Sequence, residues 1–261
     1  MSDDRDFALF IERIKGKTHI DLSQYKEAQM KRRLTTLRQK HGFGTFDLYW
    51  QALEQNRGLL NEFLDRMTIN VSEFYRNPNR WDVLQKRFLP EMLQQTDGKL
   101  NLWSAACSTG EEPYTLAMIL SELGVFGKTT ILATDLDTNV LQKAMEGIYL
   151  ERSLRDVPAA CKQTYFKEQD GAFAVSDKLK EHIRFKQQNL LYDSFGDSYD
   201  LIVCRNVMIY FTEEAKHLLY HKFAKALKPG GLLFVGSTEQ IFTPAQYGFE
   251  TADTFFYRRV N

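Results

Sequence analysis

Residues 100–135 constrain the fold of this chain more than any other stretch. An apolar run from Leu100 to Ala106 leads into a turn of small residues that ends at Gly110, and a helix-like segment and a second apolar run ending in Asp135 follow. This order predicts a strand, a tight turn, a crossover helix and a second strand. The turn lets the backbone approach a ligand, the helix N-terminus offers free N–H groups, and the acid accepts hydrogen bonds from ribose hydroxyls. The stretch therefore predicts a nucleotide-type ligand site.

The residues of the turn narrow the kind of ligand. A dinucleotide turn needs the pattern G-x-G-x-x-G, whereas this turn has one glycine followed by Glu111 and Glu112. Two carboxylates would repel a pyrophosphate, and no G-K-[ST] follows to make a P-loop. Carboxylates suit a ligand that carries a positive ammonium or sulfonium group together with ribose hydroxyls. S-adenosylmethionine fits that description.

Polar residues also follow three further predicted strands. In open α/β sheets, ligands bind outside the carboxyl ends of the strands. The polar positions are Asp135 after 130–134, Asn189 after 183–188, and Arg205 with Asn206 after 200–204. We expect these side chains and the Gly110 turn to line one site.

The remaining pattern divides the chain into three parts. Residues 1–68 carry short amphipathic segments that predict a small helical bundle. Residues 69–80 form a linker, and residues 81–261 alternate strands with helices, which predicts a mostly parallel α/β sheet. Residues 148–182 interrupt this alternation, and an insertion of that length is usually functional or a small subdomain rather than a plain loop.

Composition excludes several classes of protein. The 34 basic and 34 acidic residues give a formal net charge of zero, so no global field favours nucleic acid or membrane. Three cysteines without paired spacing argue against a disulfide framework and a zinc cluster, and the histidines are scattered. The acidic N-terminus is not a secretory signal, and no apolar run approaches the length of a membrane span. We expect a soluble cytoplasmic protein without a metal.

One segment departs from this neutrality. Between Lys26 and Lys40 there are six basic residues and one acid, Glu27. Such a run is commonly a solvated helix face. In a neutral chain it also suits a docking surface for an acidic macromolecule, and both interpretations stay open.

Longer motifs identify a family. The chain contains, in order, NVSEFYRNP, AACSTGEEPYTLAM, ATDLDTNVLQKAMEGIY, CRNVMIYF and LKPGGLLFVGSTE, preceded by the basic segment YKEAQMKRRLTTLRQKHGF. Over nearly its whole length it resembles the CheR family of chemotaxis receptor methyltransferases, and especially the Bacillus-type members. The resemblance implies a Rossmann-like methyltransferase sheet with a small N-terminal helical bundle and a small β-subdomain insertion.

The resemblance also implies an activity and a partner. The chain would transfer a methyl group from S-adenosylmethionine to glutamate side chains on the cytoplasmic helices of methyl-accepting chemotaxis receptors. The products would be glutamate methyl esters, made during chemotaxis adaptation. We expect a monomer that neither binds nucleic acid nor inserts into the membrane.

Roles for individual residues follow from the matched motifs. The implied cofactor contacts are Asn70, Ser72, Arg76, Glu111, Glu112, Asp135, Asn189, Leu190, Arg205 and Asn206. Arg76 and Tyr210 would be catalytic: Arg76 would position the incoming carboxylate through a forked hydrogen bond, and Tyr210 would contact the methyl group or orient the acceptor. Arg32, Arg33 and Arg38 of the basic segment would dock the receptor helix.

Two other functions stay open. The basic segment would also suit a methyltransferase that acts on nucleic acid, although the neutral net charge and the absence of an NPPY-type motif count against it. A non-catalytic protein that binds S-adenosylmethionine and a partner would keep the same fold. The complete set of polar residues at the strand ends argues against that loss of activity.

Overall fold

The computed structural model describes residues 3–67 and 72–260. The chain forms two compact units, and the first is discontinuous in sequence. Unit 1 comprises Met1–Ile69 and Met208–Leu218, and unit 2 comprises Asn70–Val207 and Leu219–Asn261. The segment 208–218 was expected to belong with the sheet, so its grouping with the N-terminal helices is a finding of the structure.

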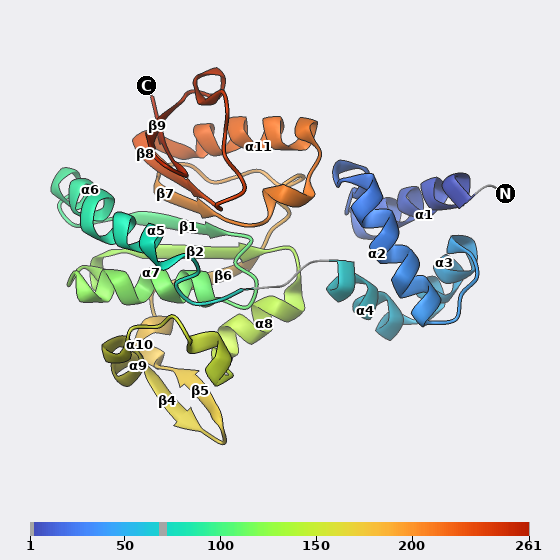
Figure 1. Ribbon diagram of the computed structural model, residues 1–261, viewed down its shortest axis with the longest axis horizontal. Coiled ribbons are helices and arrows are strands. Elements are labelled where there is room, and N and C mark those ends of the chain that lie inside the picture. The colour runs from blue at the N-terminus through green and yellow to red at the C-terminus, as the bar shows by residue number, and fades with distance from the viewer. Residues whose placement is uncertain (1–2, 68–71, 261) are drawn as a thin grey trace. The chain divides into compact units, whose positions relative to one another are not determined.

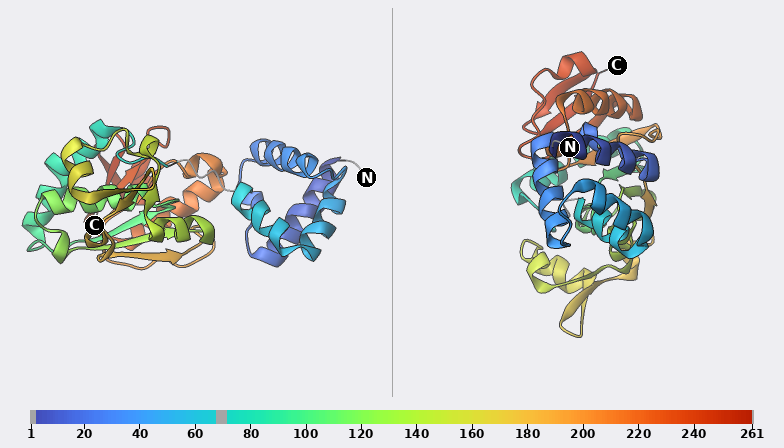
Figure 2. Two further views of the ribbon diagram at one scale, coloured as in Figure 1. Left: turned by 90° about the horizontal axis from the view of Figure 1, so that it is seen from below. Right: turned by 90° about the vertical axis from the view of Figure 1, so that its right-hand side faces the viewer.

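The N-terminal part of unit 1 is a bundle of four helices (Figures 1 and 2). They are α1 (Asp3–Thr18), α2 (Glu27–Lys40), α3 (Phe46–Gln55) and α4 (Arg57–Met67), with a short 3-10 turn, η1 (Leu22–Gln24), before α2. Aromatic side chains fill the bundle, with Phe10 contacting Phe46 and Tyr49. The buried carboxylate of Asp6 accepts the N–H of Phe46 at 2.6 Å, so α1 helps to begin α3.

Unit 2 is built on a seven-stranded sheet with the strand order β6-β2-β1-β7-β8-β10-β9. The strands are β1 (Asn101–Ala105), β2 (Thr130–Asp135), β6 (Ile183–Gln187), β7 (Tyr199–Cys204), β8 (Leu227–Val235), β9 (Phe249–Asp253) and β10 (Phe256–Arg259). The first five are parallel, and β10 pairs antiparallel with both β8 and β9. From β1 the chain runs outward through β2 to β6 and then returns to β7 on the other side, so the order reverses between β1 and β7. Ligands of doubly wound sheets bind at this reversal.

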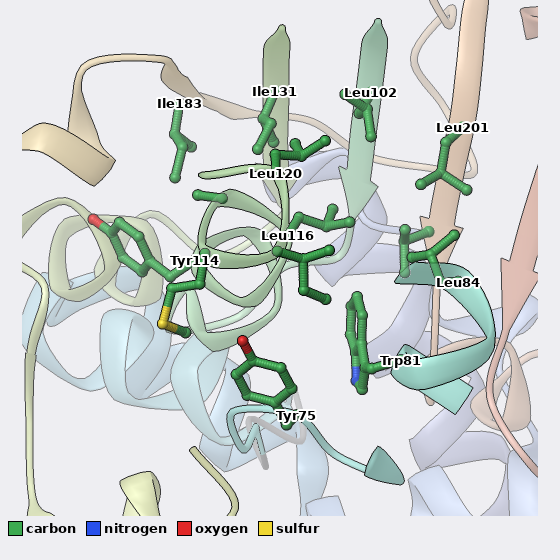
Figure 3. Packing of buried hydrophobic residues seen from close by; sticks show 14 of the residues in the cluster. Tyr75, Trp81, Leu84, Leu102, Tyr114, Leu116, Leu120, Ile131, Ile183 and Leu201 are labelled. Atoms are coloured by element: carbon green, nitrogen blue, oxygen red, sulfur yellow. The ribbon is translucent and has the colours of Figure 1, made fainter. Parts of the chain in front are cut away.

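Helices and short turns precede or connect these strands along the chain. They are α5 (Pro78–Val83), the π-helical turn η2 (Leu84–Phe88), α6 (Leu89–Gln95), α7 (Glu111–Glu122), the 3-10 turn η3 (Phe126–Lys128), α8 (Thr138–Glu146), the 3-10 turn η5 (Met208–Tyr210), α11 (Glu213–Ala226) and the 3-10 turn η6 (Pro244–Tyr247). Figure 3 shows Leu116 and Leu120 of α7 against Leu102 of β1 and Ile131 of β2. Trp103, the next residue of β1, contacts Phe223 of α11 on the opposite face. Successive residues of β1 are therefore buried on both faces, which explains its continuous apolar run.

The interruption at 148–182 contains a second, three-stranded sheet with the order β3-β5-β4. Its elements are β3 (Ile148–Tyr149), the 3-10 turn η4 (Glu151–Leu154), α9 (Ala159–Tyr165), β4 (Phe166–Gln169), β5 (Ala172–Val175) and α10 (Asp177–Lys180). The hairpin β4–β5 projects from the rest of unit 2 in both figures (Figures 1 and 2). The predicted Rossmann-like α/β fold with a helical N-terminal part and a β insertion is confirmed.

Two local features differ from what their residue types favour. Pro229, Gly230 and Gly231 are residues that typically follow the end of a helix, but they lie within β8, which already begins at Leu227. Ser23 is a common helix cap, but the cap position of α2 is Lys26, and Ser23 donates its N–H to the Asp21 side chain.

Candidate functional site

The turn after β1 has an unusual backbone conformation. Ala106, Ser108 and Gly110 all have positive φ angles, of 60°, 49° and 95°. Gly110 is required here, because a Cβ at this position would lie 2.9 Å from the Cβ of Ala144 in α8. The Cys107 N–H donates to the Thr134 carbonyl of β2 at 2.8 Å, which fixes the turn against the neighbouring strand. The turn is therefore held rigidly at the carboxyl end of β1.

The two glutamates at the start of α7 differ in their surroundings. Glu111 is buried, and its carboxylate accepts hydrogen bonds from the hydroxyls of Thr109 at 2.7 Å and of Ser72. Burial raises the pKa of Glu111 above its ordinary value. Within residues 3–67 and 72–260 no ion pair involves Glu111, so a cationic group of a ligand would relieve the cost of burying it.

Glu112 lies on the inner side of the turn. Its carboxylate accepts the Ser104 hydroxyl of β1 at 2.8 Å. Desolvation raises the pKa of Glu112 to about 7, although the positive charges of Arg205 and Arg76 act in the opposite direction. Both glutamates were predicted as cofactor contacts. In the structure, Glu112 accepts a hydrogen bond from β1 and interacts electrostatically with Arg205 and Arg76.

Asp135 ends β2 and supports the turn from the other side. Its Oδ2 accepts the Ser108 N–H at 2.8 Å and its Oδ1 accepts the Asp137 N–H at 3.0 Å. Burial raises the pKa of Asp135 to about 6. The Ser108 hydroxyl beside it is buried and has no hydrogen-bond partner in the described part of the chain. Asp135 and Ser108 therefore offer unused polar capacity that a hydroxyl-bearing ligand would satisfy.

The segment after β6 adds a third polar edge. The Gln188 N–H donates to the Asp135 carbonyl at 2.9 Å, while its side-chain Oε1 is buried without a partner among the described residues. The Asn189 side-chain oxygen accepts the N–H groups of Leu191 and Tyr192 and so stabilises the turn. The Leu190 side chain is buried. Asn189 and Leu190, both predicted as cofactor contacts, thus lie next to the carboxyl end of β2.

Arg205 follows β7 and is buried in an aromatic environment. Its guanidinium lies over the rings of Trp81 and Phe234, at 5.3 and 4.7 Å from their centroids. Nη2 donates to the Arg76 carbonyl at 2.7 Å and to the Asn77 side chain at 2.8 Å. Burial lowers the pKa of Arg205. Arg205 therefore ties the junction before α5 to the end of β7.

Glu239 is a buried residue of the site that the sequence did not reveal. Its Oε2 accepts the N–H groups of Asn206 at 2.6 Å and of Gly236 at 2.7 Å. Gly236 must be a glycine, since a Cβ there would lie 2.9 Å from the backbone nitrogen of Asn206. Glu239 lies shortly after the carboxyl end of β8, just as the predicted polar residues lie after other strands. That position is the signal that could have identified it. Ser104, Ser108 and Gln188 were also missed.

The remaining predicted residues divide between the two units. Asn70 lies outside the described residues. In unit 2, Arg76 interacts electrostatically with Glu112 and Arg205. In unit 1, Arg32 is exposed, while Arg33 is partly buried with Tyr25 and Tyr210 nearby.

Arg38 is a correction to the predicted docking surface. Its side chain is only 6% exposed, lies over the Phe46 ring at 4.4 Å and approaches the Asp6 carboxylate at 3.9 Å. Arg38 is four residues after Leu34 and so continues the apolar stripe of α2. Its stem packs within the bundle, which makes it unsuitable for a receptor contact.

The raised pKa of Glu112 predicts how stability depends on pH. Because the folded state holds this proton more tightly, the contribution of Glu112 to stability is greatest below about pH 4.5 and is lost as the pH rises through about 7. We expect a loss of about 2 kcal/mol over this range, allowing for partial solvent exposure. Urea unfolding of the unsubstituted chain and of Glu112→Gln at about pH 5.5 and about pH 8 measures it. An equal pH dependence in both proteins would contradict the assignment.

No three His, Cys, Asp or Glu side chains in 3–67 and 72–260 are grouped so that they could hold a metal ion. Over the same ranges, no helix has both the length and the apolar character needed to span a membrane.

Comparison with known proteins gives matches over nearly the whole chain. Residues 70–256 match the family model described as "CheR methyltransferase, SAM binding domain", and residues 5–68 match "CheR methyltransferase, all-alpha domain". The chain is 44% identical over 254 residues to the chemotaxis protein methyltransferase of Listeria monocytogenes, covering 97% of each protein. It is 33% identical over 246 residues to the chemotaxis protein methyltransferase of Escherichia coli, covering 90% of this chain and 84% of that relative.

Proposed function

Because this chain belongs to the CheR family of methyltransferases, we propose that it methylates glutamate side chains on the cytoplasmic helices of chemoreceptors, with S-adenosylmethionine as the methyl donor. The observation that carries the proposal is a pair of buried carboxylates, Glu111 and Asp135, on either side of one turn at the sheet reversal. Acceptor helices of such receptors are cytoplasmic, so we propose that the enzyme works there, as a monomer.

The residues present fit this donor. A buried carboxylate without an ion pair suits the positive amino group, and Glu111 would hold it. Asp135 would accept the ribose hydroxyls, and Ser108 and Gln188 each keep an unused buried oxygen beside it. When bound, the donor supplies a methyl group activated by a positive sulfur.

The acceptor needs no general base. A glutamate carboxylate has an ordinary pKa near 4.3 and is already ionised at neutral pH. Catalysis therefore consists of holding the acceptor oxygen in line with the methyl group and excluding water. We propose that Arg76 positions the acceptor carboxylate, that Tyr210 contacts the methyl group or orients the acceptor, and that Arg32 docks the receptor helix.

A turnover assay tests this function. The chain is incubated with labelled S-adenosylmethionine and receptor cytoplasmic fragments, and we expect label in base-labile methyl esters on glutamate. The matched control is the same fragment with its acceptor glutamates changed to alanine, which should remain unlabelled. Label on nucleic acid would favour a nucleic-acid methyltransferase. Cofactor binding without any methyl ester would favour a non-catalytic protein that binds S-adenosylmethionine. Either result overturns the proposal.

A further inference from the structure

The segment after Asn206 returns to the N-terminal helices. Residues 208–218 belong to unit 1, and within that unit residues 24–26 and 210–212 form a short antiparallel pairing. The Lys26 N–H donates to the Tyr210 carbonyl, and the Thr212 N–H donates to the Gln24 carbonyl, both at 2.9 Å. We call this pairing the bridge. It fixes the backbone on both sides of Phe211, and the Tyr210 carbonyl directly.

Side chains make the bridge rigid. The rings of Tyr25 and Phe211 meet edge to face with centroids 5.0 Å apart, and Phe211 is only 3% exposed. The N-terminal side of the bridge follows η1, where the Asp21 carboxylate accepts both the N–H and the hydroxyl of Ser23. Buried aromatic pairs and local caps of this kind leave the backbone little freedom.

Arg33 joins the bridge to two helices. It lies on α2 and donates to the Arg66 carbonyl in the last turn of α4. Its charge interacts with the hydroxyls of Tyr25 and Tyr210, and burial lowers the pKa of Arg33. The neighbouring Arg32 is exposed. Two adjacent arginines of one helix therefore face different surroundings, although the family resemblance implied receptor docking for both.

We propose that the N-terminal helices position Tyr210 through the bridge and Arg33. Arg33 then sets the turnover rate, whereas Arg32 sets the affinity for the receptor. This inference rests on the proposed function, in which Tyr210 acts next to the reacting atoms. A displacement of about 1 Å at a reacting centre costs on the order of 100-fold in rate. A partial loosening of Tyr210 should therefore reduce kcat with little change in the KM for receptor.

The backbone offers a sharp test at Lys26. Its φ is −58°, which proline adopts without strain, and the preceding Tyr25 is extended, as a residue before proline prefers. Lys26→Pro replaces the N–H that bonds to the Tyr210 carbonyl by a ring methylene directed at the same oxygen, so the bridge must open at this point. Lys26→Ala removes the same side chain and keeps the N–H. We expect kcat of Lys26→Pro to fall about tenfold relative to Lys26→Ala, with receptor KM values within about twofold.

Arg33 is tested alongside. Arg33→Ala should lower kcat about tenfold, and Arg33→Lys should restore part of the loss by keeping the charge. Arg32→Ala should instead raise the receptor KM at unchanged kcat. Amide hydrogen exchange of residues 208–213 should be faster in Lys26→Pro than in Lys26→Ala, a measurement that needs no turnover.

The outcomes distinguish a failure of this inference from a failure of the proposed function. One outcome is that the unsubstituted chain methylates receptor glutamates, that Lys26→Pro has the kcat of Lys26→Ala, and that Arg33→Ala has the kcat of the unsubstituted chain. The inference is then overturned and the proposed function stands. Equal exchange rates in the two Lys26 variants overturn it as well. If the unsubstituted chain forms no methyl ester, the proposed function and the inference fail together.

Discussion

Asp135→Ala is expected to weaken binding of S-adenosylmethionine by about 100-fold or more. Two charge-assisted hydrogen bonds to ribose hydroxyls would be lost, each worth about 1.5–3 kcal/mol. The same carboxylate also holds the N–H groups of Ser108 and Asp137, so its removal loosens the turn that carries Glu111. Both effects reduce affinity.

Calorimetric titration of the variant measures the change, and two further variants separate the effects. Asp135→Asn keeps the size of the side chain and one acceptor oxygen, and should lose less affinity than Asp135→Ala. Ser108→Ala removes only the unpartnered hydroxyl and should cost about 0.5–1.5 kcal/mol. An unchanged affinity in Asp135→Ala would remove this residue from the cofactor site.

Glu239→Ala is expected to lower the free energy of unfolding by about 2–5 kcal/mol. The substitution leaves the N–H groups of Asn206 and Gly236 buried without their acceptor, and each unsatisfied group costs about 1–3 kcal/mol. Because Asn206 directly follows Arg205, we also expect the cofactor affinity to fall.

Denaturant unfolding measures this change. Glu239→Gln retains an acceptor oxygen and should recover most of the stability, so it isolates the hydrogen bonds from the charge. Thr238→Ala, at the exposed neighbouring position, should change stability by less than about 0.5 kcal/mol. A loss in Glu239→Ala no greater than that in Thr238→Ala would show that the two N–H groups find other partners.

Much of the fold was predictable because it rests on local patterns. The apolar runs of β1 and β2 are buried on both faces, and such runs identify parallel strands without knowledge of their neighbours. The Gly110 turn was equally visible, because its conformation depends on a residue that tolerates positive φ. Strand ends then indicated which polar residues would gather.

Other features depend on contacts that a linear pattern does not encode. Arginine is usually a surface residue, and only the packing of Arg38 over Phe46 shows that its side chain lies within the helical bundle. Glu111 and Glu112 are adjacent and identical in type, yet their positions on the helix give them different partners. Glu239 was missed because its role requires Asn206 and Gly236 to lie together in space.

The discontinuity of unit 1 has a consequence for how the chain acquires its structure. Tyr25 pairs with Phe211, and residues 208–218 complete unit 1. These residues are synthesised long after the four N-terminal helices. Pairing over such a separation requires a large loop to close, which slows folding. A fragment cut at the linker would lack Phe211 and so expose the Tyr25 ring that Phe211 packs against, which would favour aggregation. Unit 1 can therefore be completed only after β7 has been synthesised, and a chain that ends before residue 208 cannot form the whole unit.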